Sequence, residues 1–185
     1  MTSAFVTDAR RYADKYRTTK TLWRLLAENY GLQALLAYRL GRYLLRARHN
    51  YYAWPLLPVA WPLYYLLSRY VRAAFDIRLE LSADIGPGLY IGHFGAIRVG
   101  RCRIGANCSI GRLTNIVPAG AGPGPVIGDR VWIGAHAQIV GSYRIGSSVT
   151  VSAGSVVQRD LPDKALCLGN PARVVMPKYD NSGFL

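Results

Sequence analysis

The sequence predicts a mainly β protein, in which a parallel β-helix follows an N-terminal α-helical region. Three observations support this fold class. A branched aliphatic residue returns every six positions between Ile85 and Val157, glycine follows many of these residues, and the chain before residue 77 shows helical spacing and most of the aromatic residues. An α-helix has a period of 3.6 and an alternating strand a period of 2, so a period of six fits neither. It fits hexapeptide repeats, each of which supplies one short strand and one turn.

The repeat has two interruptions. One extra residue follows Ile97, and an eleven-residue step separates Ile116 from Ile127. Three hexapeptides make one triangular coil of about 18 residues, so the regular positions predict about four coils. Leu79 lies six residues before Ile85, where an irregular first hexapeptide is expected. The regular positions are Ile85, Ile91, Ile97, Ile104, Ile110, Ile116, Ile127, Ile133, Ile139, Ile145, Val151 and Val157.

Residues 1–76 form the predicted helical domain. A short polar helix is expected over residues 4–17. Thr21 has the position of an N-cap, and helical spacing of apolar residues follows it. The pattern predicts one long amphipathic helix with a bend at Gly31 or Gly41.

Residues 51–67 carry no charge and include three prolines. A membrane-spanning helix needs about 20 apolar residues, and proline breaks a straight span. We therefore expect a Pro-rich turn and then a helix over about 59–74. The flanking Trp, Tyr and Arg residues are typical of a membrane interface, which would make 1–76 a membrane-associated domain with contact through 42–72. A helical hairpin buried against its own subunit or a trimer partner is the other interpretation, and the sequence leaves both open.

The net charge of +13 favours a negatively charged partner. No nucleic-acid-reading motif accompanies this charge, so nucleic acid is not expected. The first 21 residues lack the apolar stretch of a secretion signal. Cys102, Cys108 and Cys167 show neither metal-ligand spacing nor a disulfide framework. These features predict reduced cysteines in a cytoplasmic protein, peripheral on the inner face of the bacterial inner membrane.

Stacking of the coils predicts which side chains meet. His93 is two residues after Ile91, and Arg112 is two residues after Ile110. If Ile91 and Ile110 stack, Arg112 lies next to His93, one coil along. The Gly- and Pro-rich insertion at 117–126 must leave the wall as a loop, and we expect a mobile loop over His93. The predicted column consists of Ile91, Ile110, Ile133 and Val151.

Three segments resemble the hexapeptide-repeat acyltransferases. They are GLYIGHFGAI at 88–97, PVIGDRVWIGAHAQIVG at 125–141 and VVQRDLPDKALCLGNPARVV at 156–175. The resemblance covers about residues 77–176 and is greatest to the serine acetyltransferase branch, which includes exopolysaccharide and colanic-acid biosynthesis acetyltransferases. It implies a left-handed β-helix, a homotrimer with active sites between subunits, and acetyl-CoA as cosubstrate without a metal.

On this resemblance, His93 matches the family's catalytic histidine and is expected to act as general base. Arg112 is a further candidate, for stabilising the oxyanion. The acid that pairs with this histidine in serine acetyltransferase aligns with Arg78. Glu80 and Asp84 are the nearby acids that are candidates to replace it.

The resemblance also assigns the cofactor site. Four small residues match corners that let pantetheine approach the backbone, and two arginines match positions that meet the CoA phosphates. These residues are Gly134, Ala135, Ser152, Ala153, Arg159 and Arg173.

The expected reaction is acetyl transfer from acetyl-CoA to a hydroxyl of a sugar or lipid-linked glycan in surface polysaccharide biosynthesis. Arg78, and Gly124 in place of a second active-site histidine, argue against serine. Serine O-acetyltransferase of cysteine biosynthesis is nevertheless the alternative enzyme, and a non-catalytic β-helix scaffold is the alternative of another class. A zinc hydratase is not expected, because it needs three His ligands and only His93 and His136 lie in the repeats. Residues 177–185 are expected to form a loose tail.

Overall fold

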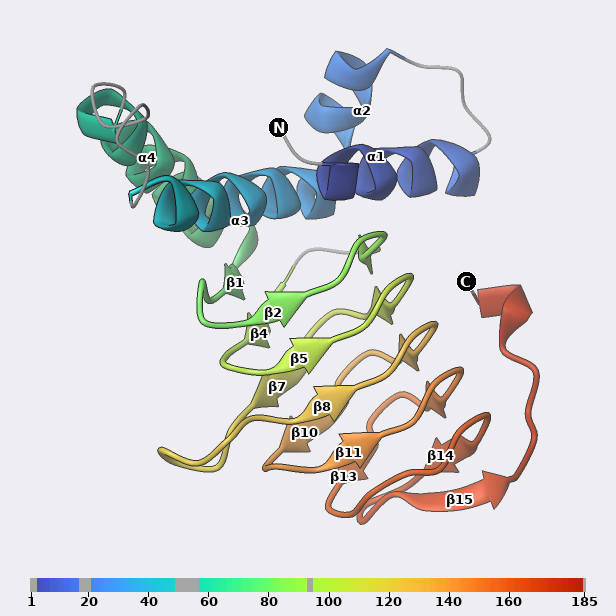
Figure 1. Ribbon diagram of the computed structural model, residues 1–185. Coiled ribbons are helices and arrows are strands. Elements are labelled where there is room, and N and C mark those ends of the chain that lie inside the picture. Colours follow the sequence, from blue (N-terminus) through green and yellow to red (C-terminus); the bar gives the residue numbers. More distant parts are fainter. Residues whose placement is uncertain (1–2, 17–20, 49–56, 93–94, 185) are drawn as a thin grey trace.

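The computed structural model describes residues 3–16, 21–48, 57–92 and 95–184, and it confirms a parallel β-helix beneath a layer of helices (Figure 1). The helices are α1 (Ser3–Lys15), α2 (Leu22–Glu28), α3 (Tyr30–Ala47) and α4 (Leu57–Phe75), and a 3₁₀ turn spans Ser182–Phe184. The strands are β1 (Ile77–Leu79), β2 (Asp84–Ile85), β3 (Tyr90–Ile91), β4 (Ile97–Val99), β5 (Arg103–Ile104), β6 (Ser109–Ile110), β7 (Asn115–Val117), β8 (Val126–Ile127), β9 (Trp132–Ile133), β10 (Gln138–Val140), β11 (Arg144–Ile145), β12 (Thr150–Val151), β13 (Val156–Val157), β14 (Leu166–Leu168) and β15 (Arg173–Met176).

The strands form three sheets, which are the three walls of a prism. Sheet A has the order β1-β4-β7-β10-β13, sheet B has β2-β5-β8-β11, and sheet C has β3-β6-β9-β12-β14-β15. The neighbouring strands pair in parallel, except that β15 returns antiparallel to β14. Each coil therefore visits sheets A, B and C in turn.

One buried aliphatic or cysteine residue per strand points into the prism and stacks on its counterpart in the next coil. The predicted column of Ile91, Ile110, Ile133 and Val151 is confirmed in sheet C. Leu79 does begin the first coil, so there are five coils rather than about four. The columns are Leu79, Val99, Ile116, Ile139 and Val157 in sheet A; Ile85, Ile104, Ile127, Ile145 and Leu161 in sheet B; and Ile91, Ile110, Ile133, Val151 and Cys167 in sheet C.

The predicted position of the first interruption is wrong. Val99, not Ile97, aligns with Ile116, and Ile97 pairs with Ile77 instead. The step from Ile91 to Val99 is therefore eight residues, whereas the later steps from sheet C to sheet A are six. Ile97 and Val99 are both buried on one face of β4, so a count of aliphatic residues does not distinguish them. The irregularity lies before Ile97, in the connection that includes position 93.

The predicted long helix is two helices. α2 begins directly after Thr21, as expected, although the Thr21 side chain makes no capping hydrogen bond. The break falls at Asn29, not at a glycine. Asn29 has an extended backbone (φ −118°, ψ 102°), and its side-chain amide donates a 2.8 Å hydrogen bond to the Leu25 carbonyl. An Asn side chain that bonds a preceding carbonyl competes with the helix ladder and ends it.

The two glycines serve close packing instead of bending. A Cβ on Gly31 would overlap the Ile91 carbonyl oxygen of the prism, and a Cβ on Gly41 would lie 2.6 Å from the ring of Tyr64 on α4. Both are closer than real side chains approach. Glycine at these positions lets α3 lie directly on the first coil and directly against α4.

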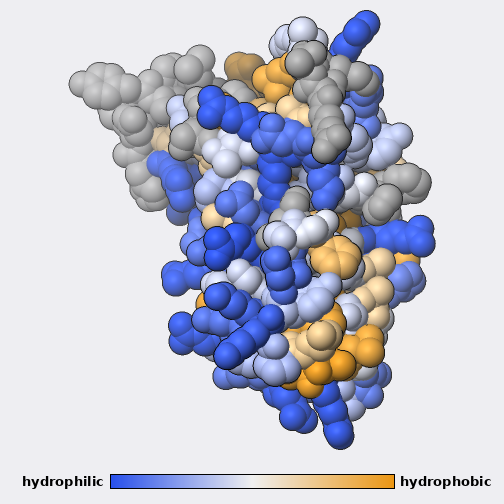
Figure 2. All heavy atoms as spheres, turned by 90° about the vertical axis from the view of Figure 1, so that its right-hand side faces the viewer, coloured by the Kyte–Doolittle hydropathy of each residue, from blue (hydrophilic) through white to orange (hydrophobic). Residues whose placement is uncertain are grey.

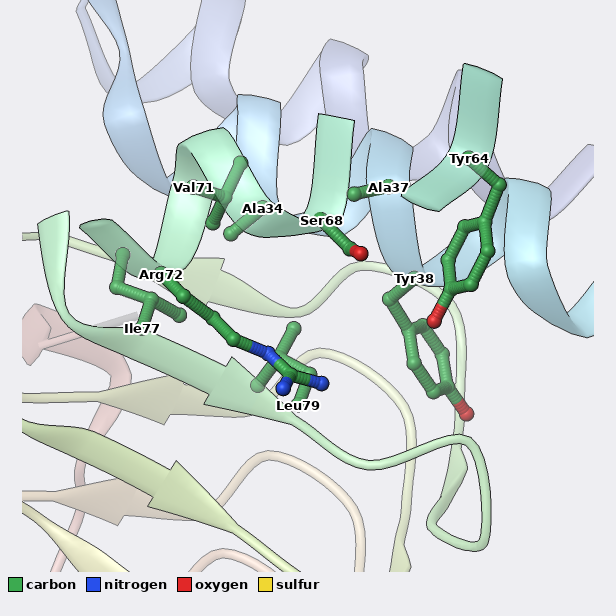
Figure 3. Close-up of a pocket in the computed structure, with 9 residues that line it drawn as sticks. All are labelled: Ala34, Ala37, Tyr38, Tyr64, Ser68, Val71, Arg72, Ile77 and Leu79. Atoms are coloured by element: carbon green, nitrogen blue, oxygen red, sulfur yellow. The ribbon is translucent and has the colours of Figure 1, made fainter. Parts of the chain in front are cut away.

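α3, α4 and β1 meet at a well-packed seam (Figure 3). Tyr38 and Tyr64 stand side by side across it, and the Arg72 side chain extends along β1 toward Leu79. The cavity that remains has a volume of about 20 Å³, which is room for about one water molecule. This seam fixes the helices on the prism and is too small to bind a substrate.

The open end of the first coil receives its hydrogen-bond partners from α3. The Tyr38 hydroxyl donates to the Ala83 carbonyl at 2.8 Å and accepts from the Ile85 N–H at 3.2 Å. The Arg39 guanidinium donates to the carbonyls of Ile85 and Gly86, each at 2.6 Å. These contacts replace the strand that a further coil would have supplied.

α1 satisfies the next part of the same edge. The buried Asp8 carboxylate accepts from the N–H groups of Gly88 and Leu89 at 2.6 and 3.1 Å, and it pairs with Arg39 at 3.0 Å. The Tyr12 hydroxyl both donates to the Ile91 carbonyl and accepts from its N–H. α1 and α3 together therefore cap sheets B and C.

The C-terminal segment is not the expected loose tail. It runs back along the prism toward α1 (Figure 1). The buried Asn181 side chain donates to the Arg130 carbonyl at 2.7 Å, and the Phe184 ring packs on Trp132 with a centroid distance of 4.9 Å. The Phe184 carbonyl accepts a hydrogen bond from Lys15 of α1. An amide and an aromatic ring anchor the segment, and neither forms part of the repeat.

The edge cap predicts a stability effect. Tyr38→Phe leaves the Ile85 N–H without its acceptor in a buried place, so the free energy of unfolding should fall by about 1–3 kcal/mol. Urea denaturation at one fixed protein concentration measures this. Tyr43→Phe, on the same helix with 49% of the residue exposed, is the matched control and should change little. Equal effects of the two substitutions would contradict the role assigned to the Tyr38 hydroxyl.

The three cysteines are buried and unpaired, as the sequence predicts. Burial raises the pKa of the Cys102 thiol to about 12, helped by the charges of Glu80 and Asp84, and burial raises the pKa of Cys108 to about 11. The pKa of Cys167 is raised for the same reason. Because the thiolate is the reactive form, none of these thiols should be nucleophilic near neutral pH.

This predicts thiol behaviour that a colorimetric assay can measure. At pH 8 the folded protein should leave all three thiols unreacted with an aromatic disulfide reagent over minutes. All three should react once a denaturant is added. Rapid reaction of even one thiol in the folded protein would contradict the burial of that thiol and its raised pKa.

Candidate active site

The turns between the sheets form three edges that run along the prism. We call the edge between sheets C and A the C–A corner; it consists of residues 92–96, 111–114, 134–137 and 152–155. The A–B corner consists of 80–83, 100–102, 118–125, 141–143 and 158–160. The position of each candidate residue follows from the corner to which it belongs.

The top of the C–A corner is anchored by the end of α4. The Gly95 N–H donates to the Phe75 carbonyl at 2.9 Å, and the Ile97 N–H donates to the Asp76 carbonyl at 3.1 Å. Gly95 in turn accepts from the Leu113 N–H of the next coil at 2.9 Å. Gly95 and Ala96 both have positive φ (106° and 41°), as the two extra residues of this turn require. α4 thus supports the turn in which the predicted catalytic histidine lies.

His93 itself, with residue 94, lies outside the described residues. Arg112, predicted to stand beside it, is exposed on the C–A corner one coil along, and its carbonyl accepts from the His136 N–H at 2.9 Å. His136 is exposed as well. The corner thus places an arginine and a histidine directly below the turn of residues 92–96.

The four small residues assigned to CoA are neighbours on the C–A corner. Gly134 and Ala135 follow β9, and Ser152 and Ala153 follow β12, which pairs with β9. A Cβ on Gly134 would lie 2.5 Å from the Ala153 backbone nitrogen, so only glycine allows this spacing of the coils. Ala153 is exposed and Ala135 half-buried. Gly134 is buried and Ser152 half-buried, so the four residues form a strip without large side chains, which Ala153 exposes most.

The two arginines separate. Arg173 begins β15 and pairs with Leu168, the residue after Cys167 of the last coil. This position is at the lower end of the C–A corner. Arg159 follows β13 and lies on the A–B corner. Both side chains are exposed. Of the two arginines assigned to the CoA phosphates, Arg173 and not Arg159 shares a corner with the strip of small residues in the same chain.

The two candidate acids also lie away from the C–A corner. Glu80 is on the A–B corner, where its carboxylate accepts from the Ser82 hydroxyl at 2.9 Å. Asp84 is on β2 and forms an ion pair with Arg42 at 2.9 Å. Neither lies beside the turn that contains position 93 in the same chain, and Asp84 has a structural partner of its own.

Asp76 is an acid that the sequence argument missed. It directly precedes β1, so it is at the C–A corner, and its carbonyl binds Ile97 next to the turn of residues 92–96. Its side chain is 44% exposed and pairs with Arg78 at 3.2 Å. The sequence does contain a sign of this position. Leu79 is expected to begin the first coil, and a residue just before a strand of sheet A lies at the C–A corner.

The insertion does leave the wall as a loop, as predicted, but at the A–B corner. It is also held in place. Arg101 donates to the carbonyls of Ala121 and Gly122, and the Ser142 hydroxyl donates to Pro123 at 2.5 Å. The expectation of a mobile loop over His93 is therefore wrong for a single chain, because two other coils bind the loop on a different corner.

No metal centre is evident in the part of the chain that the structure describes: no three His, Cys, Asp or Glu side chains are grouped closely enough to hold an ion. Among the described residues, the C–A corner offers the imidazole of His136, the guanidinium of Arg112 and the carboxylate of Asp76.

Comparison with known proteins gives relatives of one kind. The chain is 30% identical over 157 residues to a serine acetyltransferase of Helicobacter pylori, covering 83% of this chain and 85% of the relative. It is 31% identical over 149 residues to the serine acetyltransferase of Synechococcus elongatus, covering 78% of this chain and 57% of that protein. The chain thus spans little more than half the length of some relatives. No protein-family model matches the chain.

Solved structures give the same result. A soybean serine acetyltransferase in complex with serine superposes with a TM-score of 0.76 at 32% identity, covering 94% of this chain and 68% of that one. A serine acetyltransferase in complex with CoA has a TM-score of 0.76 at 25% identity, covering 93% and 68%.

The five coils, the cap of helices and these likenesses define the chain as a hexapeptide-repeat acyltransferase with the left-handed β-helix fold. Within that class, the chain belongs to the serine acetyltransferase family.

Proposed function

We propose that the chain is an acetyl-CoA-dependent O-acetyltransferase with its active site at the C–A corner. One observation carries this proposal. The chain belongs to a family of acetyltransferases, and its strip of small residues (Gly134, Ala135, Ser152 and Ala153) lies on the same corner as position 93. A strip of small side chains suits the close approach of an extended pantetheine chain, and Arg173 at its lower end suits a phosphate.

In the proposed reaction, His93 takes the proton from an acceptor hydroxyl as its oxygen attacks the thioester carbon. The carbonyl oxygen becomes an oxyanion, for which Arg112 and the N–H groups of the corner are the available donors. The C–S bond then breaks, the acetyl group stays on the acceptor oxygen, and the sulfur leaves as CoA thiol with a proton. The thioester is already activated, so no covalent enzyme intermediate is needed.

The acid that orients His93 is better assigned to Asp76 than to Glu80 or Asp84. Asp76 shares the corner with position 93, while the other two lie elsewhere in the chain. Its pairing with Arg78 divides its charge between two partners, so its effect on the imidazole should be smaller than that of a dedicated partner.

Serine is the acceptor that the relatives favour, since the names of the relatives and of the soybean complex specify serine. A sugar or glycan hydroxyl is the second candidate. Two positions support it: Arg78 and Gly124 stand where the serine enzymes carry an acid and a histidine.

A homotrimer completes the proposal. Figure 2 shows a hydrophobic area over the last coils of the prism, and the structure exposes 40–55% of four aliphatic residues there. An exposed patch of this kind marks a contact surface, and closed symmetric assembly is a common way to cover it. A subunit contact would also bring the A–B corner of one chain toward the C–A corner of another. The four residues are Leu168, Val174, Val175 and Met176.

An acetyl-transfer assay that offers serine and sugars as acceptors tests the function. The purified chain should release CoA from acetyl-CoA when L-serine is present, and mass spectrometry should find O-acetylserine.

His93→Ala should lower kcat by about 10²-fold or more, because proton removal contributes that much, while the assembly stays intact by light scattering. His136→Ala, on the same corner, is the matched control. Turnover with sugars but not serine would select the second acceptor, and near-normal turnover of His93→Ala would refute the mechanism.

The cofactor strip is tested separately. Ala153→Trp puts a large side chain onto an exposed corner position, so it should raise the KM for acetyl-CoA about tenfold or more without changing the melting temperature. Ala106→Trp, at the equivalent hexapeptide position on another corner, should leave KM unchanged. The shift in melting temperature on adding CoA reports binding directly, and equal shifts in the two variants would place CoA elsewhere.

A further inference from the structure

The outer face of α4 keeps an unusual amount of apolar surface in water. Val59, Leu63, Leu66 and Tyr70 are 73%, 59%, 66% and 54% exposed. Their spacing of three and four residues places them on one stripe of the helix. The opposite stripe, with Val71 and Phe75, is buried against α3 and the prism. The exposed stripe is therefore a second apolar face that the described fold does not use.

A second apolar outcrop lies on α2. Trp23 is 79% exposed, which is unusual for the largest side chain in proteins, and Leu22 beside it is 47% exposed. Figure 1 shows α2 above α1, on the side away from the prism, and α4 at the other end of the helical layer, sloping down to β1. Two separate apolar outcrops at one end of a molecule fit a broad surface better than a single groove-binding segment.

The charge around the α4 outcrop is of one sign, whereas α2 carries Arg24 and also Glu28. Residues 29–75 contain six Arg and no Asp or Glu. Arg39 and Arg42 are paired with acids from outside that range, but Arg69 on α4 is exposed next to the apolar stripe. Arg24 is likewise exposed and directly follows Trp23. Each apolar outcrop is thus accompanied by a guanidinium that can bind a phosphate.

We propose that the outer faces of α4 and α2 lie on an anionic lipid membrane surface. Leu63 and Leu66 enter the acyl boundary, the aromatic rings of Tyr70 and Trp23 lie at headgroup depth, and Arg69 and Arg24 contact lipid phosphates. Among the residues that the structure covers, no helix has the length and hydropathy of a membrane span.

Charge argues against a second copy of the chain as the occupant. Two α4 faces brought together would place basic residues against basic residues, because α4 carries no acid. An anionic bilayer instead offers apolar depth and negative charge together.

Vesicle flotation with the full chain tests this. The chain should float with vesicles of equal parts phosphatidylcholine and phosphatidylglycerol at low salt, and should float poorly with phosphatidylcholine alone or at high salt. Leu63→Ser with Leu66→Ser should lower the partition coefficient at least tenfold, because two large apolar groups lose their contact with lipid. Val59→Trp should raise it.

Val126→Ser with Arg144→Gln is the matched control, since both residues are exposed on sheet B away from the helices. It should bind vesicles like the natural chain. Thermal unfolding of each variant separates loss of binding from loss of fold, and the gain expected for Val59→Trp does not depend on a damaged variant. Failure of the natural chain to float with anionic vesicles would overturn the proposal. So would equal binding by the serine variants and the control, or a larger assembly in solution that dissolves only in Leu63→Ser with Leu66→Ser.

Discussion

The open end of the β-helix is the constraint on which the rest of the structure depends. A parallel coil leaves one row of backbone N–H and C=O groups unpaired at its first turn, and such groups are costly when buried and aggregation-prone when exposed. Here Tyr38, Arg39, Asp8 and Tyr12 bind those groups one by one. The cap therefore has a polar inner face that matches the edge of a sheet, which is why its helices hold buried hydroxyl and ionic groups rather than a purely apolar contact.

The same cap reaches the candidate active site. α4 ends at Phe75 and Asp76, whose carbonyls hold Gly95 and Ile97, and the two extra residues of the turn lie between those anchors and Ile91. The end of α4 therefore belongs to the cap and also binds the described end of the connection that contains position 93, the proposed general base.

The sequence predicts the regular part well, because a repeat buries the same residue type in each coil and Ile110, Ile133 and Val151 can be counted into one column. It predicts the irregular part poorly. Ile97 and Val99 are equally good inward residues, so only the pairing of β4 with β7 shows which belongs to the column. Asp76 was missed for the same reason, since an acid before the first strand belongs to a corner only once the strand is placed. Likewise Asn29 ends a helix through a local hydrogen bond that apolar periodicity does not report.

The arrangement of cap and corner also bears on the acceptor. The inner faces of α1 and α3 bind the edge of the prism, whereas the outer faces of α4 and α2 expose apolar side chains with Arg69 and Arg24 beside them. With that end on a membrane, the turn of residues 92–96 is the part of the C–A corner nearest the lipid, while the small residues near Ala135 and Ala153 extend away from it. A lipid-linked acceptor would then arrive from the cap side and acetyl-CoA from the coil side, without competing for one entrance. A small free acceptor such as serine would gain nothing from this geometry. If the proposed membrane contact holds, acceptor choice and docking are linked through this geometry; if serine is the acceptor, as the relatives favour, the two are independent.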